Sequence, residues 1–295
     1  MSGFIAYLVT PLSRDGSQVR ADLFEPYLDG LLAECRLTAV ACLANDFAYL
    51  TAEERRRAAS DAVRKARGRV PVYVCTSAIS TAEAIELSKH AADQGAAKVI
   101  VNPQNYSRLS EDQILRHYVA IARAIAIPIH IYNNPVTTNI NMSVSLLRRI
   151  VDETGAHSIK EAGSPVEKFQ DLQAEFGSKV ALHVGFHYMA LGGFALGANA
   201  WDVGLVRPIA AACYRLFRAA VVDRDLPVAQ ELFAKLLPLF VFFQERGPLP
   251  SLKALAAFDG LDLGGTRAPI EGIDEKSSDD LRNRLRYVLE LEGAT

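Results

Sequence analysis

Eight short apolar runs, separated by amphipathic stretches, most constrain how this 295-residue chain can fold. One run and its amphipathic stretch together take about 25–30 residues, a spacing typical of strands that alternate with helices in a parallel sheet. Most runs are continuously apolar, as expected of strands buried on both faces. The runs lie at 3–11, 38–44, 70–77, 97–102, 127–132, 157–162, 179–184 and 198–204.

Eight strand–helix units close a (β/α)8 barrel, so we predict an α/β fold of this type. A doubly wound open sheet is the alternative, but no run is followed by the glycine-rich phosphate turn typical of that fold. Beyond residue 224 the strand pattern ends, and helices are expected at 226–243, 250–258 and 278–291. We predict a barrel at 1–223 and a helical region at 224–295 that packs on it.

Helix start signals precede the amphipathic stretches. A first helix is expected over 21–35. Thr51 followed by Glu54 fits a capping box, in which the hydroxyl and the carboxylate satisfy each other's neighbouring N–H groups. The further candidate starts are Thr81, Ser110, Ser143 and Ser164-Pro165.

Composition excludes several classes of partner. A net charge of −2 gives no reason to expect binding to nucleic acid or to a membrane surface. The first apolar run begins within a few residues, which leaves no room for a signal peptide, and no run approaches the roughly 18 residues of a spanning helix. We therefore expect a soluble cytoplasmic protein. Cys35, Cys42, Cys75 and Cys213 are expected to be buried thiols, because no C-x-x-C occurs.

Lys160 ends the run at 157–162. Alternation places it with Ser158 and Ala162 on one face of the strand, and Ile159 with Glu161 on the other. Free lysine has a pKa of about 10.4, and desolvation at the mouth of a barrel can lower it toward roughly 7–8, which makes the amine a nucleophile for a ketone. The alternative is a loop lysine ion-paired with Glu161.

Tyr132 closes the run at 127–132 and shares a strand face with His130. A phenol at the rim can both give and accept the protons that imine formation requires. The alternative is an aromatic side chain that covers apolar area. The six histidines show no spacing typical of a metal site. Three of them lie on different strands, however, so a metal site formed by residues far apart in the sequence is not excluded. We predict no metal and no cofactor.

Short motifs occur along nearly the whole chain. They are Val9-Thr10-Pro11 with Asp15-Gly16, the stretch 47–55, Pro103 with Tyr106, Tyr132-Asn133-Asn134-Pro135, Ile159-Lys160-Glu161-Ala162, Gly185, Gly197-Ala198, and Arg267 with Pro269. In these motifs the chain resembles the dihydrodipicolinate synthase/N-acetylneuraminate lyase family, Schiff-base aldolases and dehydratases that act on pyruvate-type 2-keto acids.

The resemblance implies a (β/α)8 barrel with C-terminal helices and a homo-oligomer, a tetramer or dimer. It makes Lys160 the imine-forming lysine, Tyr132 the proton-relay tyrosine and Tyr106 the tyrosine that reaches a neighbouring subunit's site. The substrate, a small 2-keto acid, is expected at Leu43, Ala44, Asn45, Thr137, Gly185, His187 and Asp202.

The chain departs from the family in three places. Where the family usually has G-T-T-G-E, positions 42–46 are Cys-Leu-Ala-Asn-Asp, so both hydroxyls that hold the keto acid are missing. The synthase subgroup has an arginine shortly after its Y-N-x-P motif, where this chain has Val136-Thr137-Thr138. True dihydrodipicolinate synthase activity is therefore not expected. Where many relatives have an aspartate, this chain has His187, which either touches the substrate or caps the next helix.

Three functional hypotheses follow. The first is a class I lyase that cleaves or forms a carbon–carbon bond next to the ketone of pyruvate or a related 2-keto acid. The second retains the imine but eliminates water from a 2-keto-3-deoxy sugar acid. The third is a keto-acid-binding protein of the same fold with impaired turnover, motivated by Leu43 and Ala44.

Overall fold

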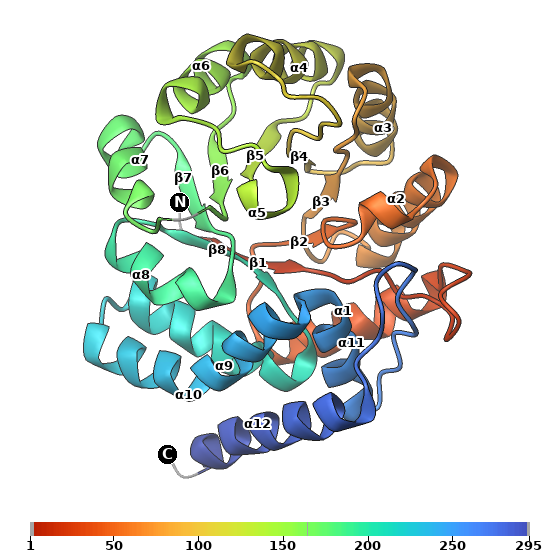
Figure 1. Ribbon diagram of the computed structural model, residues 1–295, viewed down its shortest axis with the longest axis vertical. Coiled ribbons are helices and arrows are strands. Elements are labelled where there is room, and N and C mark those ends of the chain that lie inside the picture. Colours follow the sequence, from red (N-terminus) through yellow and green to blue (C-terminus); the bar gives the residue numbers. More distant parts are fainter. Residues whose placement is uncertain (1–2, 164, 294–295) are drawn as a thin grey trace.

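The computed structural model describes residues 3–163 and 165–293 and shows a closed barrel of eight parallel strands in sequence order, with β8 paired to β1 (Figure 1). The (β/α)8 prediction is confirmed, and the open sheet is wrong. Each strand is shorter than the apolar run that predicted it, because the run continues into the adjoining loops. The strands are β1 Gly3–Tyr7, β2 Ala39–Cys42, β3 Val72–Cys75, β4 Lys98–Val101, β5 Ile129–Asn133, β6 Ser158–Glu161, β7 Ala181–Val184 and β8 Ala200–Gly204.

Helices surround the barrel, and the last three lie together along one side of it (Figure 1). The longer helices are α1 Phe24–Glu34, α2 Ala52–Ala66, α3 Thr81–Asp93, α4 Glu111–Ala124, α6 Val144–Thr154, α7 Lys168–Phe176, α9 Arg207–Phe217, α10 Leu226–Arg246, α11 Pro248–Phe258 and α12 Glu275–Gly293. The short ones are η1 Ala21–Leu23, η2 Phe47–Tyr49, α5 Pro135–Thr138, η3 His187–Met189, α8 Ala190–Ala195 and the π-helical η4 Arg218–Val222.

Most predicted helix starts are confirmed. Thr51 and Glu54 form the capping box of α2, and Ser110 and Ser143 cap α4 and α6. The prediction of a start signal at Thr81 was wrong by one residue, because the Ser80 hydroxyl accepts the hydrogen bond from the Glu83 N–H. The predicted start at Ser164 lies outside the described residues, and α7 begins at Lys168.

The C-terminal helices share one apolar core with the barrel. Helix α10 packs against α8, α9 and η3, and α11 packs against α9 and α12. Where the barrel ends and a separate region begins, at 223/224, stays a prediction.

The expectation that no segment has the length and apolarity of a membrane span was wrong for α10. By length and composition alone this 21-residue helix, with a mean hydropathy of 1.6, could cross a membrane. Its polar residues are spread through the sequence, so no continuous apolar run was visible. In the structure the helix buries Leu236, Leu239, Phe240 and neighbouring side chains against the barrel.

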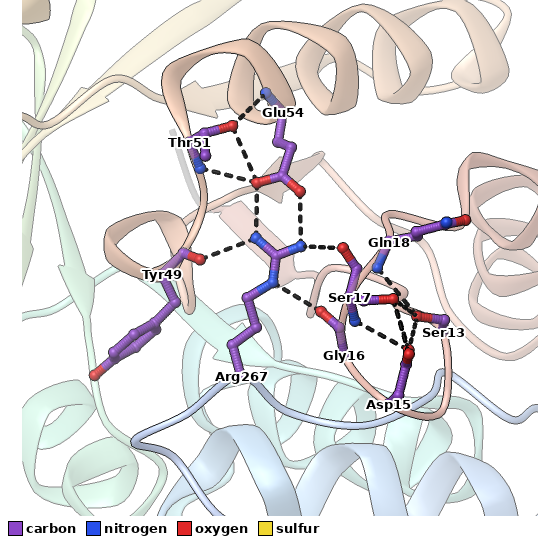
Figure 2. Close-up of polar contacts among 9 residues, drawn as sticks. All are labelled: Ser13, Asp15, Gly16, Ser17, Gln18, Tyr49, Thr51, Glu54 and Arg267. Atoms are coloured by element: carbon purple, nitrogen blue, oxygen red, sulfur yellow. Dashed lines mark hydrogen bonds and ion pairs between the residues drawn. The ribbon is translucent and has the colours of Figure 1, made fainter.

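Arg267 ties the segment between α11 and α12 to the loop after β1 and to the start of α2 (Figure 2). Its guanidinium donates to both carboxylate oxygens of Glu54, each at 2.7 Å. It also donates to the backbone carbonyls of Gly16, Ser17 and Tyr49. Side chains of the pair are 19% and 24% exposed, so water screens the interaction only in part.

We predict that Arg267→Ala lowers the free energy of unfolding by about 2–3 kcal/mol, since it removes several hydrogen bonds to a charged group. Arg14→Ala is the matched control. Arg14 pairs with Asp262 of the same segment, but these side chains are 91% and 53% exposed. The control should change stability by less than about 0.5 kcal/mol. Urea unfolding measures both, and equal effects would contradict the role given to Arg267.

Candidate active site

A cavity of about 260 Å³ opens at the carboxyl ends of the strands, the face where enzymes of this fold build their sites. Strands β1, β5, β6 and β8 supply its floor, and loops supply its walls. Eight of the ten predicted site residues line it: Ala44, Asn45, Tyr132, Thr137, Lys160, Gly185, His187 and Asp202.

Lys160 lies in the middle of this floor. Its strand neighbour across the β5–β6 pair is Tyr132. The Lys160 Nζ atom lies 3.4 Å from the centre of the Tyr7 ring and 4.1 Å from that of Tyr132, so the amine is held between two aromatic faces. Burial lowers the pKa of Lys160 to about 7, although the nearby Asp202 carboxylate acts in the opposite direction. A substantial fraction of the amine is therefore neutral at pH 7.

The alternative pairing of Lys160 with Glu161 does not occur. The two side chains point to opposite faces of β6, as the alternation predicted. The Glu161 carboxylate binds Lys168 Nζ at 2.9 Å and accepts hydrogen bonds from the Asn133 amide. The Lys160 amine is left facing the cavity.

The Tyr132 phenol is placed to donate a proton. Its oxygen accepts a hydrogen bond from Asn134 Nδ2 at 2.9 Å, which leaves its own hydrogen available. Burial raises the pKa of Tyr132 above its ordinary value, so the phenol stays protonated at neutral pH. The hydroxyl can therefore act first as an acid and then take the proton back.

Asp202 lies at the bottom of the cavity, where its carboxylate is already engaged by protein. Tyr7 Oη donates to it at 2.9 Å, and His130 Nε2 and His183 Nδ1 each lie 2.7 Å from one of its oxygens. Burial by itself would raise the pKa of Asp202, but the two imidazoles hold it well below its usual value. Asp202 thus fixes Tyr7 and adds negative charge beneath Lys160.

His130, His183 and Asp202 are also the group most suited to a metal ion among the described residues, with ligand atoms within 4.8 Å of one another. This is the assembly in space that the sequence left open. Burial lowers the pKa of His130 to about 4, so its ring is neutral. Its Nδ1 accepts from the Ser158 hydroxyl, which in turn accepts from Lys98 Nζ. The cluster therefore forms a connected hydrogen-bond layer under the cavity.

Two predicted site residues lie elsewhere. Leu43 is buried with a positive φ of 65°, and its side chain packs in the core instead of lining the cavity. A left-handed residue in the loop reverses the side-chain direction that strand alternation would give. Tyr106 is 95% exposed on the loop after β4, so it does not reach the site of its own chain.

The capping interpretation of His187 is wrong, and its contact with the substrate stays a prediction. Its side chain makes no capping hydrogen bond to η3. Since a carbonyl can only accept, His187 Nε2 carries the hydrogen and donates to the Gly204 oxygen at 2.9 Å. Burial lowers the pKa of His187 to about 4, which keeps the ring neutral. The ring forms part of the cavity wall.

Several residues of the site escaped sequence reasoning. Tyr7 is the last residue of β1, but the first apolar run continues to residue 11, so periodicity did not mark it as the end of a strand. Asn134 lies inside the Y-N-x-P motif, but its contact with the phenol depends on loop conformation. Phe47 from η2, Phe186 from the loop after β7 and Pro248 from the start of α11 come from three segments that the periodicity does not place together.

We predict that Asp202→Asn moves the pH midpoint for reaction of Lys160 with a ketone to lower pH. The Asp202 charge raises the pKa of Lys160, so removing it lets burial lower that pKa further. The rate of borohydride trapping with pyruvate, measured across pH 5 to 9, gives the midpoint. A midpoint that stays in place or rises would show that the two groups are not coupled.

Comparison with known proteins agrees with this geometry. The model of the Dihydrodipicolinate synthetase family matches residues 1–287. The chain is 31% identical to a 4-hydroxy-tetrahydrodipicolinate synthase of Acidiphilium cryptum, over 95% of this chain and 96% of that protein. It is 29% identical to one of Dechloromonas aromatica, over 97% and 98%.

Among solved structures, the dihydrodipicolinate synthase of Agrobacterium tumefaciens superimposes with a TM-score of 0.89 at 27% identity, over 97% of this chain and 98% of that one. The family model covers nearly the whole chain, and family members are class I lyases. The chain therefore belongs to the Dihydrodipicolinate synthetase family and is a class I lyase.

Proposed function

We propose that this protein forms an imine between Lys160 and the ketone of pyruvate or a related 2-keto acid. The observation that carries the proposal is the buried Lys160 amine, with a pKa of about 7, held against Tyr132 in one cavity. A neutral amine is the species that attacks a carbonyl carbon, and burial supplies it at physiological pH.

The steps follow from the two side chains. The neutral amine attacks the keto carbon, and Tyr132 donates a proton to the oxygen that leaves as water. In cleavage, the protonated imine accepts the electron pair of the broken carbon–carbon bond and becomes an enamine, which then takes a proton at C3. In addition, the protonated imine first loses a C3 proton, and the resulting enamine supplies the electron pair of the new carbon–carbon bond. Hydrolysis by water returns the 2-keto acid and the free amine. No redox partner is needed, because the atoms and electrons balance within these steps.

We further propose that the second reactant is not that of the named relatives, the 4-hydroxy-tetrahydrodipicolinate synthases. Thr137 lines the cavity in the region where the resemblance leads one to expect an arginine for a second carboxylate. A hydroxyl binds a carboxylate without charge and reaches less far than a guanidinium.

The dehydratase is the alternative among class I lyases, and the impaired turnover of the third hypothesis stays a prediction. Product analysis separates the first, because cleavage gives pyruvate and an aldehyde, whereas dehydration leaves the number of carbons unchanged. Consumption of any keto acid by the unmodified protein rules out the second.

We predict that borohydride with pyruvate leaves a reduced adduct on Lys160, found by peptide mass spectrometry. Lys160→Arg should abolish the adduct, whereas Lys89→Arg, a change of the half-exposed Lys89 on α3, should not. Tyr132→Phe should lower kcat by roughly a hundredfold or more, the range of a lost acid–base group. If neither pyruvate nor any other 2-keto acid tested modifies Lys160, the proposal fails.

The loop after β2 provides a test of carboxylate binding. We predict that Ala44→Thr tightens binding of pyruvate by roughly tenfold to a hundredfold, the value of one charge-assisted hydrogen bond. Leu43→Thr is the control. Its side chain faces the core at a positive φ, so it should lower stability and leave affinity unchanged. Equal affinity in Ala44→Thr and the unmodified protein would place the carboxylate elsewhere.

We also propose a homo-oligomer in the cytoplasm. The exposed Tyr106 supports the oligomer, since a phenol on the loop after β4 is available to a neighbouring subunit. The four buried cysteines fit a reducing compartment. Sedimentation of a monomer at assay concentration would remove the role proposed for Tyr106.

A further inference from the structure

A second, smaller cavity adjoins the active-site cavity. It has a volume of about 220 Å³ and shares Phe186, His187 and Pro248 with the larger one. We call it the annex. Its other walls include Val136 from α5, Tyr188 from η3, and Phe240 with Phe243 from α10.

The annex is a mainly aromatic chamber. The Phe186 and Tyr188 rings stack with centroids 5.6 Å apart and planes 16° from parallel. Phe243 meets the His187 ring edge to face at 4.9 Å. The His187 ring is neutral, because burial lowers its pKa to about 4. Rings arranged in this way favour an apolar, flat ligand group.

Neither cavity offers a cation to a second carboxylate. Among the described residues, the annex is lined by no lysine or arginine, and the active-site cavity has only Lys160, which the imine uses. A third cavity shares Asn45 and Tyr49 with the active-site cavity and contains Arg246. There Glu245, Glu271 and Asp274 outnumber that single positive charge. A second reactant with a carboxylate would therefore find no free positively charged partner among the described residues of the first two cavities and net repulsion in the third.

From the aromatic lining of the annex and the lack of a free cation among the described residues that line it, we propose that the second reactant is an aldehyde with an apolar ring and without a carboxylate. The annex holds its ring. The inference rests on the proposed function, since it identifies the partner of the Lys160 imine. Size agrees with it, because an apolar protein cavity of about 150 Å³ holds benzene.

The reaction balances without a further reagent. In the addition direction the pyruvate imine of Lys160 loses one C3 proton to become an enamine, the enamine attacks the aldehyde carbon with its C3 electron pair, and the aldehyde oxygen takes one proton to become a hydroxyl. Water then releases a 4-hydroxy-2-keto acid with the ring on C4. In the reverse direction the hydroxyl proton is lost and the C3–C4 bond breaks, which releases the aromatic aldehyde; the enamine then takes one proton at C3, and water releases pyruvate.

The test uses the whole protein with pyruvate and three aldehydes: benzaldehyde, succinic semialdehyde and glyceraldehyde. The 4-hydroxy-2-keto acid product is quantified by chromatography. We expect kcat/KM for benzaldehyde to exceed that for each of the other two by at least tenfold. If the carboxylated or hydroxylated aldehyde is preferred, or no aldehyde reacts although pyruvate modifies Lys160, the inference is wrong and the proposed function stands. If pyruvate does not modify Lys160, both fail.

A charge placed in the annex wall gives an independent check. Val136 is 66% exposed, so Val136→Arg should fold. We expect it to lower kcat/KM for benzaldehyde by at least tenfold and to raise that for succinic semialdehyde. Val222→Arg, at a 52% exposed position on η4, is the matched control and should leave both values unchanged. An unaltered ratio in Val136→Arg would overturn the role of the annex.

Discussion

The removal of one amine from water is the constraint on which this structure depends. Lys160 is only 3% exposed, and its charged form loses hydration with no carboxylate of the described residues in direct contact to replace it. Two aromatic faces return part of the lost stabilisation through cation–π attraction. Asp202, one layer deeper, adds a further share. The balance leaves the amine near the point where both protonation states are populated, as a nucleophile that must be regenerated in each cycle requires.

The barrel makes this balance possible because parallel strands bring distant residues to one floor. Tyr7, Tyr132, Lys160 and Asp202 come from four strands, and each is set by backbone pairing to its neighbours. The layer of His130, His183 and Ser158 below them connects the polar groups by direct hydrogen bonds. The walls of the cavity come from loops, and Arg267 binds the Tyr49 carbonyl in one of them (Figure 2). The chemistry therefore lies on the rigid part of the fold, and the choice of second reactant on the less constrained part.

The difference between strand residues and loop residues explains which parts of the site the sequence could predict. Strand positions, the face of Lys160 and its pairing with Tyr132 follow from periodicity and from motif spacing, which act over a few residues. Leu43 was placed wrongly because one left-handed backbone angle in a loop redirects a side chain. Tyr106 was linked to the site by resemblance, and a single chain does not bring it there. The annex could not be predicted from the sequence, since Val136, Phe186 and Phe243 are far apart along the chain and each is an apolar residue with no motif to set it apart.

Burial, offset in part by Asp202 and the two aromatic faces, sets the pKa of the Lys160 amine before any substrate arrives. The most direct measurement is an NMR pH titration of the protein without ligand, with lysine labelled at Cε and the Lys160 signal assigned from the Lys160→Arg spectrum. We predict a midpoint near pH 7 for that signal. A midpoint near 10, the ordinary value of a solvated lysine, would contradict it.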